Sequence, residues 1–307
     1  MTQRVKRLPE GLLSALGIDA EFEVVALPGN ENENYLVKTS GQSFVVKKLR
    51  AHSAANTELE GTYRRYLADA GLPVAPYVSL NGDSFVLTLS QDSYVATPYI
   101  DGMMAAPNTQ MVTEAGALLA RVHSLDATAM PKRQNWYAKS YIPDALGLID
   151  DKYAEAKKAF AATYNETPDF WDGDFPKGII HGDMQEDNII VDSEDKIVSI
   201  IDWEEAAVEP LLLDVAHSAQ QLSFEHGICN QELFSTFMDA YQEVRPLTQK
   251  EKELFDAALR YTMLILSVWA HIKMSRGEMG NDLFQRVGNY YRASYEIPRV
   301  NWGIIRP

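Results

Sequence analysis

The character of the sequence changes near residue 100, and this change constrains the fold more than any other feature. Before it, turns containing Gly and Asn separate six short runs rich in β-branched and aromatic residues: EFEVVAL (21–27), NYLVKT (34–39), SFVVKKL (43–49), PYVSL (76–80), SFVLTL (84–89) and SYVATPYI (93–100). One helical pattern, at 54–70, interrupts them and ends before Gly71 and Pro73. We therefore expect a small lobe of strands with one helix.

After residue 102 the pattern becomes mainly helical. TEAGALLARVHSL (113–125) has apolar residues at helical spacing, and long helical patterns recur from about residue 210 onward. The length of 307 residues is sufficient for one large domain or two lobes. We expect two lobes, at 1–99 and 100–307, with a short link at 100–102.

Composition narrows the class of partner. The chain has 28 Lys and Arg against 43 Asp and Glu, a net charge of -15, which disfavours nucleic acid or an anionic membrane. The most apolar run, YTMLILSVWA (261–270), is too short to cross a bilayer and predicts a buried helix. A single cysteine, Cys229, excludes an internal disulfide and fits a reducing compartment. We expect a cytoplasmic protein with a small-molecule partner; the sequence gives no oligomeric state.

The acid-rich stretch HGDMQEDNIIVDSEDKIVSIIDWEE (181–205) contains the candidate metal-binding and catalytic residues. If its two short apolar runs pair as a hairpin, Asn188 and Asp202 lie at adjacent strand ends. Such an oxygen pair suits Mg²⁺, which takes few protein ligands and leaves room for phosphate oxygens. Asp183 would then be free to orient and deprotonate an attacking hydroxyl, which is what phosphoryl transfer requires.

These residues also carry a family resemblance. HGDMQEDN resembles the catalytic loop, and IIDWEEA the metal-binding segment, of the aminoglycoside phosphotransferase and choline kinase superfamily, which shares the protein-kinase fold. EPLLLDVA is similar to the segment whose aspartate braces that loop, here Asp214, with one extra leucine. The resemblance covers most of the chain. It implies a bilobal α+β fold with a small antiparallel sheet and one helix in a nucleotide-binding N-lobe. The larger, mainly helical C-lobe would hold the catalytic loop, metal site and substrate pocket.

The resemblance also assigns residues for ATP in the first lobe. Phe44-Val45-Val46-Lys47 is similar to the family's three apolar residues followed by the lysine that binds the α- and β-phosphates, so we expect Lys47 in this role. Lys48 must point to the opposite face, although a shift of one residue would exchange the two. Glu60 is the expected helix partner of the lysine, with Glu58 as its rival.

Two further segments are expected to contact the nucleotide. The loop GNENEN resembles the Asn-rich loop of homoserine kinases and bacterial choline kinases. Its backbone and side chains could bind phosphate oxygens, or its asparagines could simply form turns; the residues are Gly29, Asn30, Asn32 and Asn34. The hinge at Pro98, Tyr99 and Ile100 would meet adenine through the Pro98 carbonyl and the Ile100 N–H, because proline lacks a donor.

Three cues favour a small cationic alcohol, such as choline or ethanolamine, as the acceptor. Gln185 precedes the metal Asn as in choline kinases, and Glu204 and Glu205 follow the metal Asp as in the same group. Aromatic faces hold quaternary ammonium groups well, although each aromatic alone is more often a core residue; the candidates are Trp203, Trp269, Tyr290 and Tyr291. Homoserine and aminoglycosides are the alternative substrates.

Two other classes compete with a small-molecule kinase. A protein kinase would have Phe-Gly after the metal aspartate, whereas Asp202 is followed by Trp-Glu, and no Ala-Pro-Glu segment follows. A non-catalytic pseudokinase would lack part of the machinery, but Lys47, Asp183, Asn188 and Asp202 are all present. We therefore predict an enzyme that transfers the γ-phosphoryl group of ATP, with Mg²⁺, to a hydroxyl group.

Overall fold

A computed structural model describes residues 8–19, 21–28, 32–50, 53–133, 135–173, 175–225 and 228–280. The chain divides into two compact units. The first comprises Met1–Met103, Ile190–Ser193 and Val198–Glu204, and the second comprises Met104–Ile189, Glu194–Ile197 and Glu205–Pro307. The functions expected for lobes at 1–99 and 100–307 stay predictions.

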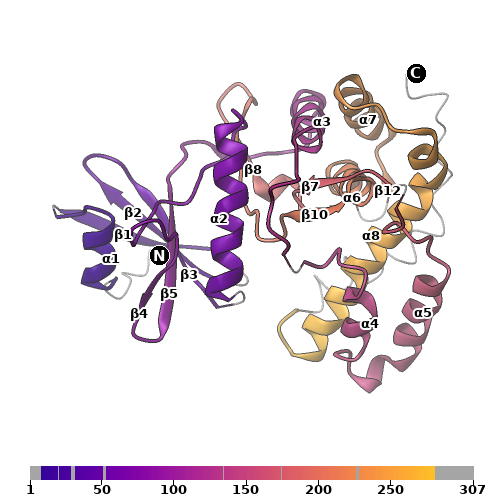
Figure 1. The fold of residues 1–307 in the computed structure, drawn as a ribbon, viewed down its shortest axis with the longest axis horizontal. Helices are drawn as coiled ribbons and strands as arrows, with labels where there is room; N and C mark the ends of the chain where they lie inside the picture. The colour runs from indigo at the N-terminus through magenta and orange to yellow at the C-terminus, as the bar shows by residue number, and fades with distance from the viewer. Residues whose placement is uncertain are drawn as a thin grey trace. The chain divides into compact units, whose positions relative to one another are not determined.

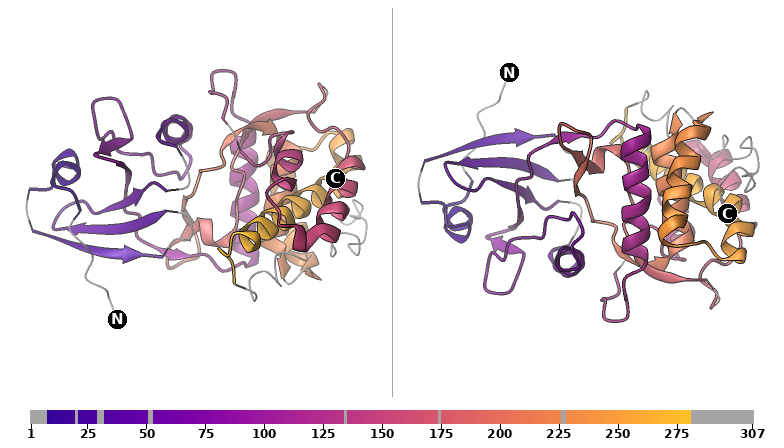
Figure 2. Two further views of the ribbon diagram at one scale, coloured as in Figure 1. Left: turned by 90° about the horizontal axis from the view of Figure 1, so that it is seen from below. Right: turned by 90° about the horizontal axis from the view of Figure 1, so that it is seen from above.

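The first unit is built on a five-stranded sheet whose neighbouring strands are all antiparallel, in the order β1-β2-β3-β5-β4. Its strands are β1 (Phe22–Leu27), β2 (Glu33–Thr39), β3 (Phe44–Lys48), β4 (Leu87–Leu89) and β5 (Asp92–Pro98). Helices α1 (Glu10–Ala15) and α2 (Ala54–Asp69) complete this unit (Figures 1 and 2). The predicted combination of strands and one main helix is confirmed.

Strand β3 lies in the middle of the sheet and presents different residues to its two faces. Phe44 and Val46 are buried in a core cluster that includes Leu12 of α1. Because side chains alternate along a strand, Lys47 points to the opposite face. Its register partners are Asn34 on β2 and Val95 on β5.

Helix α2 begins and ends where the sequence predicts. The Ser53 side chain caps its start by accepting a hydrogen bond from the Asn56 N–H, and Gly71 follows its end with φ of +75°. One face of the helix is buried and carries both an acidic and a basic residue, Glu60 and Arg64. A buried carboxylate requires hydrogen-bonding partners, so the buried face of α2 must make polar contacts as well as apolar ones.

One predicted strand is wrong. The segment PYVSL (76–80) forms no strand, and the strand expected at 84–89 is confined to β4. Tyr77 and Leu80 are buried three residues apart, whereas a strand buried on one face would bury every second residue. The backbone makes only separate hydrogen bonds, from the Val78 N–H to the Ala96 carbonyl and from the Leu80 N–H to the Ser84 carbonyl. The β-rich composition of this segment therefore predicts a strand where the backbone is irregular.

The second unit is mainly helical, as predicted. Its helices are α3 (Thr109–His123), α4 (Tyr141–Leu146), α5 (Ala154–Asn165), α6 (Leu211–Ser223), α7 (Gln231–Val244) and α8 (Gln249–Ser275), with the short 3₁₀ turns η1 (Asp151–Tyr153) and η2 (Glu186–Asn188). Helix α3 packs against α7, and Gly116 permits the close approach, because a Cβ there would lie 2.5 Å from the Phe237 carbonyl oxygen. The buried helix predicted at 261–270 is the central part of α8.

Short strands complete the architecture. β7 (Lys177–Ile180) pairs with β10 (Ala207–Pro210), and β11 (Phe224–Glu225) pairs with β12 (Ile228–Cys229). A three-stranded sheet has the order β6-β8-β9, with β6 at Met103–Met104, β8 at Ile189–Val191 and β9 at Ile197–Ile200. The two apolar runs of the acid-rich stretch are thus hydrogen-bonded neighbours, as predicted.

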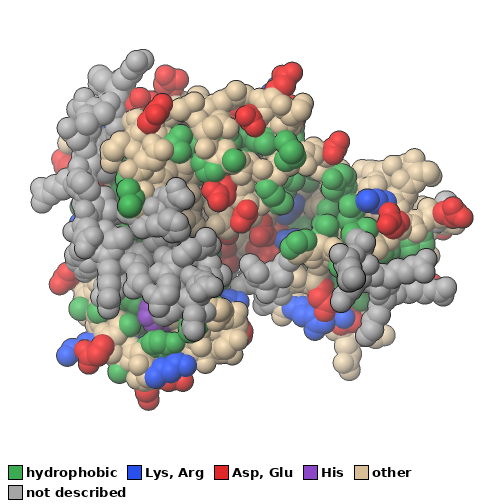
Figure 3. Space-filling model, turned by 180° about the vertical axis from the view of Figure 1, so that it is seen from behind, with side chains coloured by type: hydrophobic (Ala, Val, Ile, Leu, Met, Phe, Trp, Pro, Cys, Tyr) green, Lys and Arg blue, Asp and Glu red, His purple; other side chains and the backbone are tan. Residues whose placement is uncertain are grey.

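The surplus of negative charge does not by itself mark a site. On the face shown in Figure 3, acidic side chains are scattered among hydrophobic and neutral ones. In the part of the chain that the structure describes, no helix has the length and apolar character needed to cross a membrane.

Candidate active site

The loop between β7 and β8 is held by a buried aspartate from another element. Asp214, in the first turn of α6, accepts hydrogen bonds from the backbone N–H groups of His181 (2.8 Å) and Gly182 (2.9 Å). Gly182 has φ of +83°, and a Cβ there would lie 2.7 Å from Cβ of Glu205, so only glycine fits. Asp214 therefore fixes the loop at its start, as the resemblance implies.

A buried histidine completes this brace. His123 Nε2 lies 3.0 Å from Asp214 Oδ2. Burial lowers the pKa of His123, opposed by its hydrogen bond to Asp214. Burial alone would raise the pKa of Asp214, but the hydrogen bonds from His123 and the loop backbone lower it. The pair is thus a neutral imidazole donating from Nε2–H to an ionised carboxylate.

The brace extends further into the helical core. The Tyr241 hydroxyl lies 2.7 Å from His123 Nδ1 and accepts a hydrogen bond from Arg245 (3.0 Å). Arg245 also donates to the buried Glu251 (2.9 Å), which closes the capping box of α8 with Thr248. Residues of four helices and one connecting turn thus form a continuous polar chain that ends at the loop between β7 and β8.

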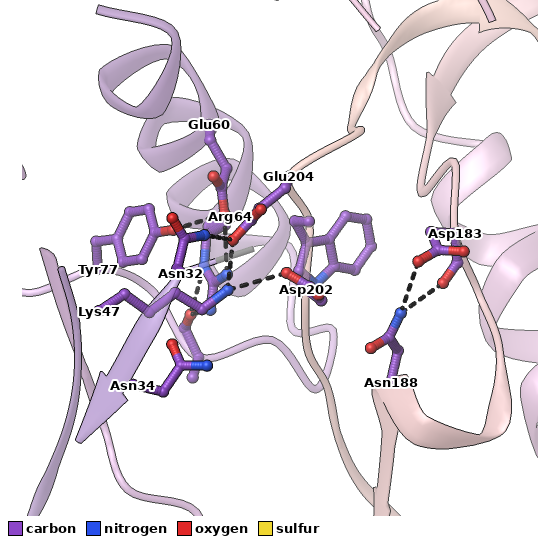
Figure 4. A network of polar contacts seen from close by, with 12 residues as sticks. Asn32, Asn34, Lys47, Glu60, Arg64, Tyr77, Asp183, Asn188, Asp202 and Glu204 are labelled. Atoms are coloured by element: carbon purple, nitrogen blue, oxygen red, sulfur yellow. Dashed lines mark hydrogen bonds and ion pairs between the residues drawn. The ribbon is translucent and has the colours of Figure 1, made fainter. Parts of the chain in front are cut away.

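Asp183 lies in this loop with its carboxylate contacted on both oxygens. Oδ2 accepts from the side-chain amides of Asn188 and Gln185, each at 3.2 Å, and the Asn188 amide also reaches the Asp183 carbonyl at 2.8 Å (Figure 4). Oδ1 lies 3.5 Å from Nε2 of His217 on α6. The side chain is 20% exposed, so the carboxylate is only partly buried.

Two aromatic residues beside the loop were missed from the sequence. The Trp136 indole N–H donates to the Gly182 carbonyl (2.9 Å), and its backbone N–H donates to Glu205 (3.1 Å). Tyr137 is fully buried and packs edge-on against His217, with ring centroids 6.0 Å apart. No short motif links these residues to the catalytic loop, so only the fold reveals them.

Lys47 lies among carboxylates in the first unit. Its Nζ is 2.9 Å from Asp202 Oδ1 and 2.6 Å from Glu204 Oε1 (Figure 4). Burial would lower the pKa of Lys47, but Asp202 and Glu204 outweigh it and raise the pKa well above its usual value. Lys48, on the other face of β3, pairs with Asp92 at 2.6 Å. The two lysines therefore have separate partners.

The expected pair of Lys47 with Glu60 is not formed, and this corrects the prediction. Glu60 accepts hydrogen bonds from Arg64 (3.1 Å) and the Tyr77 hydroxyl (2.7 Å) instead. Arg64 lies one helical turn further along α2 and is similarly buried, so it forms the ion pair with Glu60. The rival Glu58 is not the partner either, since it accepts from the N–H groups of Phe85 and Val86.

The Asn-rich loop is partly described. Asn32 donates to Glu204 (2.9 Å) and accepts from the Arg50 N–H (2.9 Å), which ties the loop to the lysine's carboxylates. Asn34 donates to the Pro28 carbonyl (3.1 Å) across the turn. Gly29 and Asn30 lie outside the described residues. The two described asparagines thus act as structural linkers within this unit.

The predicted adenine hinge is compatible with its expected contacts. Pro98 ends β5 opposite Phe44, and the Tyr99 N–H donates to the Ser43 carbonyl (2.9 Å). Tyr99 is therefore tied to β3 by its backbone while its side chain is 41% exposed. The roles of Pro98, Tyr99 and Ile100 toward adenine stay predictions.

The two predicted magnesium ligands offer suitable oxygen atoms. Because the Asn188 nitrogen is fixed by two acceptors on Asp183, its amide oxygen is the atom left for a cation. Removal from water raises the pKa of Asp202 to about 6 even though Lys47 opposes it, and Glu204 adds to the rise. A nearby cation would favour the ionised carboxylate. The donor chemistry thus fits Mg²⁺.

The predicted substrate residues differ in how the structure places them. Trp203 is completely buried, with its indole N–H donating to the Ile200 carbonyl (2.9 Å), so it is a core residue and the expectation of a ligand face there is wrong. The Glu204 carboxylate pairs with Lys47. Trp269, on α8, is half-buried beneath Lys273, whose Nζ lies 5.9 Å from the ring centroid. Tyr290 and Tyr291 lie outside the described residues.

Residues 23–249 match the model of the phosphotransferase enzyme family. The chain belongs to this family. It is therefore a kinase, and phosphoryl transfer in this family uses ATP with Mg²⁺. Its similarity to the homoserine kinase of Mesorhizobium japonicum is 28% identity over 279 residues, covering 86% of this chain and 84% of that protein.

Solved structures confirm the protein-kinase-like fold. Amicoumacin kinase in complex with AMP-PNP and Ca²⁺ superposes with a TM-score of 0.69 at 16% identity, covering 90% of this chain and 89% of that one. Choline kinase LicA from Streptococcus pneumoniae superposes with a TM-score of 0.66 at 19% identity, covering 92% of this chain and 95% of that one. At these identities the likeness concerns the fold alone. The predicted family, α+β fold class and cofactors are confirmed.

Proposed function

We propose that this kinase transfers the γ-phosphoryl group of ATP to the hydroxyl of a small amino alcohol, with Asp183 as the catalytic carboxylate. The observation that carries the proposal is the placement of Asp183, which is partly exposed, held at Oδ2 by two side-chain amides and set in a loop braced by Asp214. A carboxylate so oriented can bind a substrate hydroxyl in one direction and accept its proton as the phosphorus–oxygen bond forms.

Other residues have supporting roles in this proposal. Lys47 binds phosphate oxygens of ATP in place of its present carboxylate partners, which explains why a lysine is half-buried among acids. Asn188 and Asp202 would hold Mg²⁺, which supplies charge neutralisation for the phosphates when bound. Pro98 and Ile100 would contact adenine through their backbone.

The proposed acceptor class rests on charge near the loop. Glu205 lies against Trp136, whose indole bonds the loop at Gly182, so a carboxylate and an aromatic ring flank the loop that carries Asp183. Both can attract an ammonium group. Choline and ethanolamine remain the first candidates. Homoserine, an amino acid with a side-chain hydroxyl, is the alternative to this class, and the 28% identical relative named homoserine kinase favours it.

A substrate panel tests the acceptor. Purified protein with ATP and Mg²⁺ is given choline, ethanolamine, homoserine or kanamycin, and ADP release is measured together with the phosphorylated product. We expect turnover with one of the first three compounds. Turnover with kanamycin alone would replace the amino alcohol by an aminoglycoside, and nucleotide binding without turnover of any compound would favour a non-catalytic role.

Replacing Asp183 by asparagine tests the catalytic carboxylate. Asp183→Asn keeps the shape of the side chain but removes its basicity, so kcat should fall by about 10²–10⁴-fold. The matched control is Asp187→Asn, an exposed acid of the same loop, which should keep kcat within about twofold. Equal kcat for the two variants would refute the proposed role of Asp183.

A further inference from the structure

We infer that His217 is a positioning residue that holds the carboxylate of Asp183 from the side opposite the two amides. The inference rests on the proposed role of Asp183 and adds a residue to it. His217 lies on α6, the helix that also supplies the brace Asp214, and its side chain is fully buried. Its Nε2 lies 3.5 Å from Asp183 Oδ1.

The surroundings of His217 offer no alternative polar contact to its two ring nitrogens among the described residues. Neither ring nitrogen has a hydrogen-bond partner within the described parts of the chain. The neighbouring side chains are aromatic, with ring centroids at 6.0 Å for Tyr137 and 6.4 Å for Trp136. An apolar residue would fill this space without the cost of two unsatisfied nitrogens. The proximity of Nε2 to Asp183 is the feature that distinguishes histidine from an apolar residue here.

The geometry of Asp183 explains what such a contact contributes. Asn188 and Gln185 both donate to Oδ2, which leaves the carboxylate group free to rotate about its Cβ–Cγ bond unless Oδ1 is also held. The present separation of 3.5 Å exceeds a normal N–H···O bond by a few tenths of an ångström. A small shift of Asp183 makes this bond to the Nε2–H tautomer. With both oxygens held, the direction offered to a substrate hydroxyl is fixed.

A pair of variants of equal length separates the nitrogen from the packing. Methionine and glutamine both fill the space of His217, but only glutamine carries a donor near the position of Nε2. We expect His217→Met to lower kcat by about 10- to 100-fold with the KM for ATP unchanged, and His217→Gln to recover a large part of the loss. Thermal unfolding verifies that each variant is folded; if His217→Met does not fold, His217→Leu serves as the apolar member.

Ser218→Ala is the matched control. Ser218 is the next residue of α6, is fully buried, and its hydroxyl also has no hydrogen-bond partner among described residues. No hydrogen bond joins it to Asp183 in the part of the chain that the structure describes, so kcat should stay within about twofold of the wild type. A fall in kcat for Ser218→Ala as large as that for His217→Met would show that any change in α6 disturbs the loop, and would overturn the inference.

A double-mutant cycle with Asp183→Asn decides between positioning and general stability. If His217 acts through Asp183, His217→Met should change the residual kcat of Asp183→Asn by less than about twofold. Full additivity, or wild-type kcat for His217→Met while Asp183→Asn is impaired, would overturn the inference and leave the proposed function intact. Unimpaired Asp183→Asn would instead overturn the proposed role of Asp183, and the inference with it.

Discussion

Lys47 and Lys48 are neighbours on one strand but lie on opposite faces of the sheet and have different carboxylate partners. Lys47 lies against Asp202 and Glu204 with 20% of its side chain exposed, whereas Lys48 pairs with Asp92 on the other face of the sheet. Asp202 and Glu204 hold the ammonium group of Lys47 in one place, so that it is oriented before any phosphate arrives. Chemical equivalence of the two side chains makes them a natural test pair.

We expect Lys47→Met to lower kcat/KM for ATP by about 10²–10³-fold, because a fixed cation that stabilises phosphate charge is lost. Lys48→Met removes the same charge from the same strand and should change kcat/KM by less than about threefold. Steady-state kinetics with varied ATP measures both. A larger loss for Lys48→Met would mean that the two lysines had been assigned in the wrong order.

At the scale of elements, the loop that carries Asp183 depends on helices that lie far from it in the sequence. The polar chain from Glu251 through Arg245, Tyr241 and His123 to Asp214 links α8, α7, α3 and α6. Every link is buried or half-buried, so each donor lost leaves an unsatisfied partner. A change in α7 should therefore reach the loop through Asp214.

Tyr241→Phe should destabilise the protein by about 1–3 kcal/mol, because it leaves His123 Nδ1 and a donor of Arg245 without their partner. Tyr261→Phe is the matched control: its hydroxyl is buried on α8 and has no hydrogen-bond partner among the described residues, so its loss should be neutral or slightly stabilising. Chemical denaturation measures both differences. Equal destabilisation would show that the chain of hydrogen bonds contributes no net free energy.

At the scale of the whole molecule, buried ionisable groups make stability depend on pH in opposing ways. Burial lowers the pKa of His123, so below about pH 6.5 the unfolded chain takes up a proton that the folded protein does not. This contribution makes the protein less stable as the pH is lowered. Burial raises the pKa of Asp202 and Glu209, so the folded protein gains protons first at these sites and stability rises as pH falls. The net change of the free energy of unfolding with pH is the sum of these opposing contributions.

The contribution of His123 can be isolated by comparison with His123→Gln. Between pH 7.0 and about pH 5.5, the free energy of unfolding of the wild type should decrease more steeply than that of the variant, by at most about 1.4 kcal/mol per pH unit. Urea denaturation at several pH values gives both slopes. Identical slopes would mean that His123 binds a proton equally well in the folded and unfolded states.

The sequence predicts those parts of the molecule that depend on local pattern. Alternation places Lys47 and Lys48 on opposite faces, and capping and apolar spacing locate α2 and α8. The 76–80 segment misleads because its composition is that of a strand, although its backbone makes only separate hydrogen bonds. The sequence also does not reveal which charged residues form ion pairs with one another. Nothing in it shows that Arg64 pairs with Glu60 or that Glu204 pairs with Lys47. Trp136 and His217 could not be linked to Asp183, because only the packing of distant segments brings them together.

The backbone of Asp202 has a consequence for how this position can be studied. Its φ of +61° is a conformation that most residues with a Cβ avoid, whereas aspartate and asparagine tolerate it. An alanine scan would therefore combine loss of the carboxylate with a conformational penalty of about 1 kcal/mol or more in the segment that follows β9. Asp202→Asn removes the charge and tolerates this backbone conformation, and Asp202→Gly removes the side chain without the conformational penalty. The difference between Asp202→Gly and Asp202→Ala therefore measures the backbone contribution.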